Sequence, residues 1–230
     1  MLTPYYQQEM DSVAISREQA SQFAKQVADD FNPLHDVDAK KFCVPGDLLF
    51  SLVLERYGVS ENMHFDFVGM VDETSRLQFP PLSDAFDITS EGKVMLSVKR
   101  NGEIKQCDSL TSSLIRNYVE FSGTTFPHVI IPLMGKQDVM INPARPMVIY
   151  ESMSIHLDKL DIESVTLEPA EPEFSFEGKR GKIVLRFNLF HGDEQVGQGE
   201  KHMVVAGVRE YCQEAVDKLI EYYNERKATL

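Results

Sequence analysis

The sequence predicts an α+β protein in which an antiparallel sheet wraps around a buried helix. Leu48–Tyr57 is apolar on nearly all sides, and it lies between Pro45-Gly46-Asp47 and Gly58, which suit the two ends of a helix. A short helix without a polar face has to be covered by other structure. The chain beyond Gly58 consists mainly of β-rich segments, so we expect a sheet to cover the helix.

The composition indicates a folded chain. Its 230 residues allow one large domain or two small fused ones, and 43% of them are hydrophobic. No apolar run approaches the ~18 residues that cross a bilayer, and the N-terminal residues lack the order of a signal peptide. We therefore expect a cytoplasmic protein without a membrane partner.

Charge, cysteines and histidines exclude further classes of function. A net charge of −13 opposes the attraction to phosphates on which nucleic-acid binding depends, so no nucleic-acid partner is expected. Cys43, Cys107 and Cys212 are too few and too scattered for a disulfide framework or a zinc site, and we expect inert core thiols. No metal is expected, because metal-ligand spacing is missing at His64, His156, His191 and His202.

Two amphipathic helices are predicted, one near each end of the chain. In Ile15–Ala28, Ser16 and Gln19 have the spacing of a capping box, and apolar residues recur at three- and four-residue intervals. Pro33 prevents continuation of this helix, because a proline disfavours the helical conformation of the residue before it. Arg209–Arg226 carries an apolar stripe that we expect to pack onto the domain rather than onto a partner.

Three segments between these helices are typical of strands. Lys93–Val98 and Lys182–Asn188 are rich in β-forming residues. Each precedes a glycine-containing pair, Asn101-Gly102 or Gly192-Asp193, that favours a hairpin turn. Pro146–Leu157 alternates imperfectly, as a strand with a β-bulge does.

Two weak internal similarities suggest a duplicated unit. Gly92–Leu110 and Gly181–Val205 both open a strand with Gly-Lys-aliphatic and continue through a glycine-containing turn. Phe23–His35 and Ile115–Val129 both run a short helix into a proline-containing corner. The similarities come in the same order, which favours a repeat of roughly 100 residues with one copy eroded.

The similarities predict two units along the chain. Residues 1–110 form the first, and residues 111–230 form a degenerate second unit with the C-terminal helix. In an alternative arrangement, residues 1–57 join residues 146–208 as one unit, and residues 58–145 are an insertion. Hairpins alone could produce the first similarity, so both arrangements stay open.

The candidate site is the corner DFNPLH, Asp30 to His35. Asp30 follows a helix C-terminus, where the helix dipole disfavours a carboxylate by about 0.3–1 kcal/mol, so the placement does not serve stability. If the corner is also partly buried, the dipole and burial would both favour proton uptake, which suits a general base. Pro33 makes the corner rigid and Asn32 can bond to neighbouring loops, so Asp30 and His35 can share one water molecule.

This corner resembles the signature Gly-Asp-x-Asn-Pro-[Leu/Ile]-His of the MaoC-like, (R)-specific enoyl-CoA hydratases. Phe42–Leu54 is similar to the start of that family's central helix. Met147–Leu167 and Gly181–Val205 are similar to its closing strands, so the resemblance touches about half the chain. It implies a hotdog fold, an antiparallel sheet wrapped around a central helix, here as a fused double hotdog with a degenerate second copy.

The resemblance also implies a reaction and its residues. The family adds water to enoyl thioesters, or removes it from 3-hydroxyacyl thioesters, on coenzyme A or acyl carrier protein. Asp30 and His35 match its catalytic pair and Asn32 its structural asparagine, and the backbone N–H of Gly46 would hold the thioester oxygen. The partner is thus an acyl thioester, no separate cofactor is implied, and a homodimer is allowed.

The chain departs from the family pattern in both copies. Asp29 replaces the glycine before the catalytic aspartate, and Asp47 lies where the family has a His-Gly pair. A carboxylate ~4 Å from a forming enolate would raise the barrier by about 4 kcal/mol, unless Asp47 is an N-cap turned onto the helix backbone. In the second copy Thr124 replaces the aspartate and only Pro127 and His128 remain, so we expect the active site in the first copy.

Three functions stay open: a hydratase or dehydratase, a hotdog thioesterase in which Asp30 directs water at the carbonyl carbon, and a non-catalytic acyl-thioester binder. The first predicts a specific geometry. The Asp30 carboxylate and a His35 ring nitrogen should be one water apart and should line a tunnel beside the N-terminus of Leu48–Tyr57. Diverging side chains, or Asp47 between them, would argue against hydration.

Overall fold

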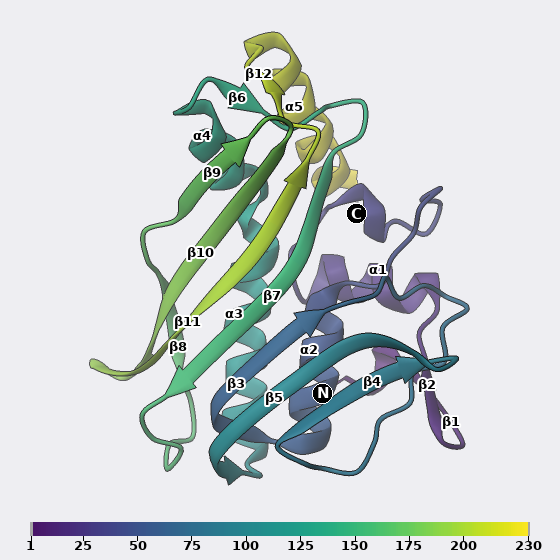
Figure 1. Ribbon diagram of the computed structural model, residues 1–230, viewed down its shortest axis with the longest axis vertical. Helices are drawn as coiled ribbons and strands as arrows, with labels where there is room; N and C mark the ends of the chain where they lie inside the picture. Colours follow the sequence, from purple (N-terminus) through teal and green to yellow (C-terminus); the bar gives the residue numbers. More distant parts are fainter. Residues whose placement is uncertain (1, 230) are drawn as a thin grey trace.

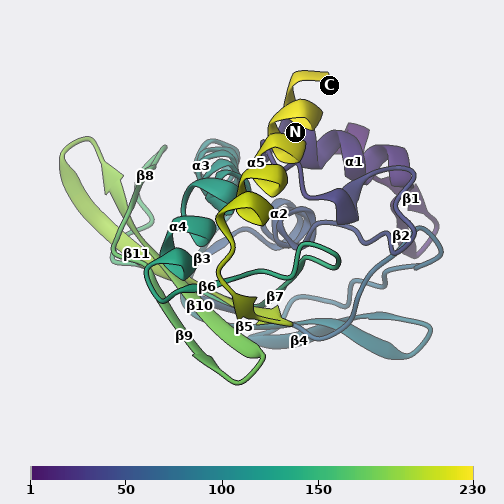
Figure 2. The ribbon, with the colours of Figure 1, turned by 90° about the horizontal axis from the view of Figure 1, so that it is seen from above.

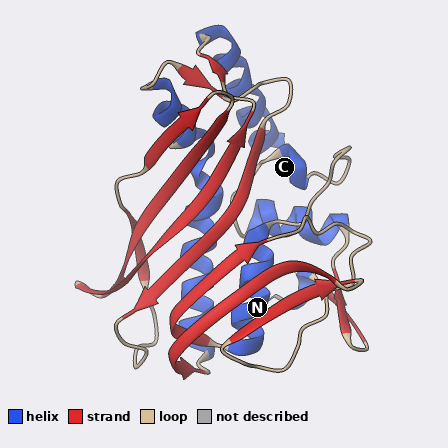
Figure 3. Cartoon of the chain, viewed as in Figure 1, coloured by secondary structure: helices blue, strands red, loops and turns tan. Residues whose placement is uncertain are grey.

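A computed structural model describes residues 2–229, and its largest element is an antiparallel sheet of eight strands (Figures 1 and 3). Strands from the two halves of the chain form one continuous surface. In spatial order they are β4 (Ala85–Ser90), β5 (Lys93–Lys105), β3 (Val59–Phe67), β7 (Met147–Leu157), β11 (Glu194–Ala206), β10 (Arg180–His191) and β8 (Thr166–Pro169), and β9 (Glu173–Glu177) also pairs with β10.

Two central helices lie side by side against one face of this sheet, and the other helices lie on the same side (Figure 2). They are α2 (Gly46–Tyr57) and α3 (Asp108–His128). Phe50 of α2 packs edge-on against Tyr118 of α3, with ring centroids 4.7 Å apart, and both side chains are fully buried. The prediction that a sheet covers an all-round apolar helix is confirmed, and the architecture is a hotdog fold with two central helices.

The two halves of the sheet meet where β3 pairs with β7. Residues 58–145 supply three neighbouring strands and α3, and β3 lies inside the sheet. The strands of residues 58–145 are thus part of the same sheet as those of residues 146–208, and the alternative that treats this segment as an insertion stays a prediction. The division of the chain at residue 110 stays a prediction.

One predicted turn is a bulge instead. Strand β5 runs straight through Asn101-Gly102, and the register with β3 shifts between Ser60 and Asn62. Gly102 adopts a φ of +83°, so its left-handed conformation adds a residue to the strand rather than reversing the chain. The turn at Gly192-Asp193 and the bulge in β7 are confirmed, the latter at Glu151, which is skipped in the register with β11.

The smaller elements surround the central helices. The capping box predicted at Ser16 and Gln19 opens α1, and both of its hydrogen bonds are present. The C-terminal helix α5 begins four residues later than predicted, because Arg209–Glu210 pair with Val139–Met140 as β12 and β6. The other bounds are η1 (Thr3–Tyr5), β1 (Gln7–Glu9), β2 (Ser12–Ala14), α1 (Arg17–Gln26), η2 (Pro33–His35), α4 (Ile130–Gly135) and α5 (Gln213–Thr229).

Helix α3 is much longer than the short helix predicted before Pro127. It extends over 21 residues and loses helical geometry at Phe126, the residue whose conformation Pro127 restricts. Helix α3 packs beside α2 as the second central helix. The correspondence between Phe23–His35 and Ile115–Val129 stays a prediction.

Gly123 fixes how closely α3 approaches Ala28, in the segment that follows α1. A Cβ atom added there would lie 1.8 Å from the carbonyl oxygen of Ala28. We expect Gly123→Ala to destabilise the protein by about 3 kcal/mol, despite the better helix propensity of alanine. Chemical denaturation measures this. Gly135→Ala is the control, since its nearest neighbour is a Tyr211 ring carbon at 3.3 Å, and an equal loss in both variants would contradict the prediction.

The cysteines differ in their exposure. Cys43 and Cys107 are partly buried, but Cys212 is exposed beside the start of α5, so the expectation of a core thiol is wrong for Cys212. Among residues 2–229, no helix is both long enough and apolar enough to span a membrane.

Candidate functional site

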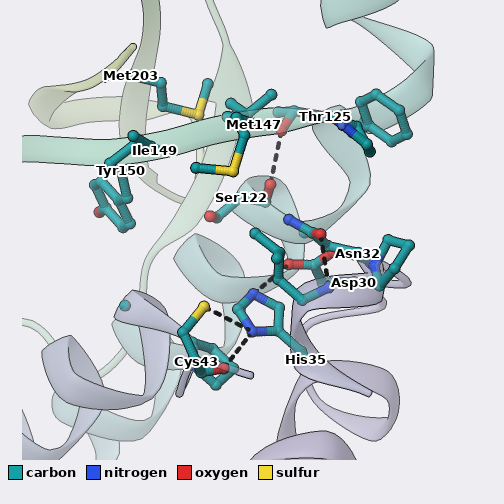
Figure 4. Close-up of a pocket in the computed structure, with 18 of the residues that line it drawn as sticks. Asp30, Asn32, His35, Cys43, Ser122, Thr125, Met147, Ile149, Tyr150 and Met203 are labelled. Carbon is teal, nitrogen blue, oxygen red and sulfur yellow. Dashed lines mark hydrogen bonds and ion pairs between the residues drawn. The ribbon is translucent and has the colours of Figure 1, made fainter. Parts of the chain in front are cut away.

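A cavity of about 700 Å³ opens between the Asp30–His35 corner, the N-terminus of α2, the C-terminal part of α3, and α5 (Figure 4). Strands β7 and β11 close its far side. Most of the lining is apolar, and it includes Val44, Leu49, Met147, Ile149 and Met203. All four residues predicted for the site, Asp30, Asn32, His35 and Gly46, line this cavity.

Asp30 and His35 face each other across a short gap. The backbone N–H of Asn32 donates to Asp30 Oδ1 at 2.8 Å, which leaves Oδ2 directed at His35 Nε2, 3.6 Å away. That separation exceeds a direct hydrogen bond and is short enough for one water molecule to contact both groups. The predicted proximity is present, and the catalytic roles of both residues stay predictions.

Asn32 holds the corner in shape. Its side-chain oxygen accepts a hydrogen bond from the backbone N–H of Leu34 at 3.1 Å and so caps the short helix η2. Pro33 occupies the first position of that helix, where its missing N–H is not needed. Local interactions thus stabilise the shape of the corner.

His35 has a defined proton on one ring nitrogen. Nδ1 lies 2.8 Å from the carbonyl oxygen of Cys43, which can only accept, so Nδ1 carries hydrogen and Nε2 faces Asp30. Burial lowers the pKa of His35, but the bonds to Cys43 and the charge of Asp30 outweigh it and raise the pKa to about 9. At neutral pH the ring is therefore an imidazolium that can give a proton.

This raised pKa predicts how stability depends on pH. Because the folded-state pKa lies above the ordinary 6.5, the stabilisation is complete below pH ~6.5 and is lost as the pH rises through about 9. The loss should be about 3 kcal/mol in the free energy of unfolding. The measurement is the difference in the free energy of unfolding between wild type and His35→Gln, taken below pH ~6.5 and again above pH about 9. A difference that does not change with pH would contradict the assignment.

Gly46 is the first residue of α2 and must lack a side chain. A Cβ there would lie 2.7 Å from a Tyr150 ring carbon and 3.0 Å from a Phe67 ring carbon. Its backbone N–H donates to no acceptor in the described part of the chain, as is usual in a first helical turn. The N–H and the helix dipole can thus stabilise negative charge on a ligand in the cavity.

Asp47 is not the N-cap that one interpretation of the sequence required. Pro45 precedes α2 without a side-chain cap, and the Asp47 carboxylate is turned toward α3 instead. Its Oδ2 accepts a hydrogen bond from the Ser122 hydroxyl at 2.6 Å, and Lys201 Nζ lies 3.9 Å from Oδ1. Burial raises the pKa of Asp47, although Lys201 and the Ser122 hydroxyl oppose this.

Sequence reasoning missed Ser122, Lys201 and Tyr150, which also line the cavity. Lys201 Nζ lies 3.9 Å from the centre of the Tyr150 ring, and the Tyr150 hydroxyl hydrogen-bonds that of Tyr118. The sequence contains one signal for Lys201. It alternates with Met203 and Val205 along β11, so its side chain points to the same buried face of the sheet. No comparable signal marks Ser122. Residues 2–229 contain no group of three His, Cys, Asp or Glu side chains suited to a metal ion.

Helix α5 contacts the residues that flank the Asp30–His35 corner through two ion pairs. Lys227 pairs with Asp29, and Arg226 lies 2.5 Å from Asp36, a buried carboxylate that Lys25 also contacts at 2.7 Å. Asp29 has a φ of +53°, a left-handed conformation that aspartate tolerates better than most residues. The departure from glycine at this position therefore keeps the backbone shape and adds an ion pair.

Comparison with known proteins gives structures of related shape and a family. An acyl-CoA thioesterase II, TesB2, from Mycobacterium marinum covers 92% of this chain and 99% of its own, at 10% identity and a TM-score of 0.48. A TesB protein of Mycobacterium avium subsp. paratuberculosis covers 71% and 87%, at 10% identity and a TM-score of 0.43. An N-terminal dehydratase of the difficidin assembly line covers 77% and 87%, at 9% identity and a TM-score of 0.35.

These similarities are too distant to indicate a reaction, and the fold assignment rests on the topology described above. No curated protein matches the sequence. A family model described as a protein of unknown function, DUF3581, matches residues 1–214, and the chain therefore belongs to that family.

Proposed function

We propose that the protein adds water to 2-enoyl thioesters, or removes it from 3-hydroxyacyl thioesters, in the cavity beside α2. The observation that carries the proposal is the 3.6 Å separation of Asp30 Oδ2 and His35 Nε2 at the cavity wall. A carboxylate and an imidazolium at this distance can take one proton and give another without moving apart. The resemblance of the corner to the MaoC-like signature supports the same reaction.

In hydration, the thioester oxygen accepts a hydrogen bond from the Gly46 N–H. The Asp30 carboxylate takes a proton from the shared water, and the water oxygen forms a bond to C3. The C2–C3 π electrons move toward the carbonyl, where the N-terminus of α2 stabilises the negative charge. His35 then gives its Nε2 proton to C2, and the proton on Asp30 passes to His35, which restores both groups.

The cavity favours an acyl chain as the bound part of the substrate. Its volume of about 700 Å³ lies in the usual range for small-molecule sites, and most of its wall is apolar. The thioester would lie near Gly46, and the carrier, coenzyme A or acyl carrier protein, would extend out of the cavity. No separate cofactor takes part in this scheme.

The test is incubation with 2-enoyl-CoA substrates of increasing chain length. Hydration removes the enoyl absorbance and yields a 3-hydroxyacyl-CoA with the thioester intact. Release of free thiol with the enoyl group unchanged, lost in Asp30→Asn, would instead support the thioesterase alternative. If neither product forms while the acyl-CoA still binds, the protein is a non-catalytic acyl-thioester binder.

A further inference from the structure

A second polar cluster lines the same cavity and takes no part in the hydration scheme. Ser122, Asp47 and Lys201 come from α3, α2 and β11, and each is only 5% exposed. Burial of an ammonium and a carboxylate in a mainly apolar cavity does not favour stability by itself. The arrangement of the three side chains therefore suggests a chemical role.

The hydroxyl of Ser122 is held between the two charged groups. It donates to Asp47 Oδ2 at 2.6 Å, and Lys201 Nζ donates to the same hydroxyl oxygen at 2.5 Å. A base thus accepts the hydroxyl proton, while a cation stabilises the negative charge that develops on the oxygen. Asp47 Oδ1 is buried and has no hydrogen-bond partner among the described residues, although Lys201 lies 3.9 Å away.

A purely structural ion pair explains this arrangement less well. Buried polar atoms are nearly always hydrogen-bonded, and among residues 2–229 Asp47 Oδ1 has no such bond and lies beside the cavity. Burial also raises the pKa of Asp47, which makes its carboxylate a stronger base than an exposed one. The backbone N–H of Gly46, one residue before Asp47, donates to no acceptor within residues 2–229 and lies at the same helix end.

We propose that Ser122 is a nucleophile that accepts an acyl group, with Asp47 as its base and Lys201 as the cation that stabilises its oxygen. The protein would then have a second activity, the hydrolysis of acyl esters or thioesters through an acyl-Ser122 intermediate. This activity uses the same cavity as the proposed hydration but not Asp30 or His35. The Gly46 N–H would stabilise the tetrahedral oxyanion.

Each bond in this scheme is accounted for. Ser122 Oγ forms a bond to the carbonyl carbon as its proton moves to Asp47 Oδ2. The bond from that carbon to sulfur or oxygen then breaks, and the leaving thiolate or alkoxide takes the proton from Asp47. Water attacks the acyl-serine and gives a proton to Asp47. The Oγ–carbon bond breaks as Ser122 regains the proton, so one water is consumed and a free acid is released.

A fluorophosphonate reagent tests the nucleophile directly, because it forms a stable adduct only with an activated hydroxyl. We expect the wild-type protein to gain the mass of one adduct, which peptide mapping places on Ser122. Ser122→Ala should reduce labelling at least 100-fold. Thr124→Ala should be labelled like wild type, because among the described residues this hydroxyl on the same helix bonds only to the backbone carbonyls of Glu120 and Phe121.

The result that would overturn the proposal is a folded wild-type protein that gains no adduct, or that gains one elsewhere than Ser122. The mapping needs no variant, so it stays decisive if Ser122→Ala does not fold. Hydration is followed by formation of the intact 3-hydroxyacyl thioester and labelling by protein mass, so each activity can fail without the other. Release of p-nitrophenol from short acyl esters, with an initial burst of one equivalent, is the matching kinetic result.

Discussion

Replacing Asp30 by asparagine is expected to lower the rate of enoyl-thioester hydration by about 10²–10⁴-fold. The amide keeps the size of the side chain and can still accept the Asn32 N–H, so the corner should keep its shape. It cannot take a proton from the shared water. The measurement is kcat/KM for loss of enoyl absorbance, with binding of a saturated acyl-CoA followed separately.

Asp29→Asn is the matched control for this variant. Asp29 is the neighbouring carboxylate, but it points to Lys227 on α5 rather than to His35. Its loss removes one partly exposed ion pair, so the hydration rate should stay within a few-fold of wild type. Equal loss of activity in both variants would contradict the prediction. It would mean that activity depends on the total negative charge of the corner and not on a base at residue 30.

The second large effect is on stability. Lys201→Met is expected to lower the free energy of unfolding by about 3–5 kcal/mol, because it leaves the Asp47 carboxylate buried without a counter-charge. Methionine fills most of the volume of the lysine side chain, so a cavity is not the main cause. Chemical denaturation at neutral pH measures the loss. It should shrink at acidic pH, since burial already raises the pKa of Asp47 and proton uptake removes the uncompensated charge.

A comparison with a surface pair isolates the effect of burial. Lys159 and Glu194 are 2.6 Å apart but largely exposed, so Lys159→Met should change stability by less than about 1 kcal/mol. Combining Lys201→Met with Asp47→Leu should recover most of the stability, since no buried charge remains. A double variant no more stable than Lys201→Met alone would contradict this account.

The candidate corner could be predicted from sequence because its geometry is local. Asn32, Pro33 and the Asp30–Asn32 hydrogen bond lie within a few residues of each other and orient the Asp30 carboxylate, and the Cys43 carbonyl, eight residues beyond His35, orients the imidazole. The all-round apolar character of Leu48–Tyr57 likewise required a covering sheet. Both are consequences of short-range patterns that the rest of the fold does not alter.

The second polar cluster could not be predicted, because it depends on contacts between distant segments. Ser122 and Asp47 are 75 residues apart and Lys201 is 79 residues beyond Ser122, so nothing in the local sequence joins them. The length of α3 was missed at its start, because Gly92–Leu110 was compared with a hairpin, whereas the helix already begins at Asp108. The bulge at Gly102 was mistaken for a turn because both features use the same left-handed glycine.

The most direct test of hydration follows the oxygen of water into the product. The protein is incubated with crotonyl-CoA in water enriched in oxygen-18, and the products are resolved by mass spectrometry. We predict that the label is on the C3 hydroxyl of 3-hydroxybutyryl-CoA, and that Asp30→Asn removes this product. Label found only in the carboxylate of a released acid, with no labelled 3-hydroxyacyl-CoA, would contradict the claim that Asp30 and His35 direct water to C3.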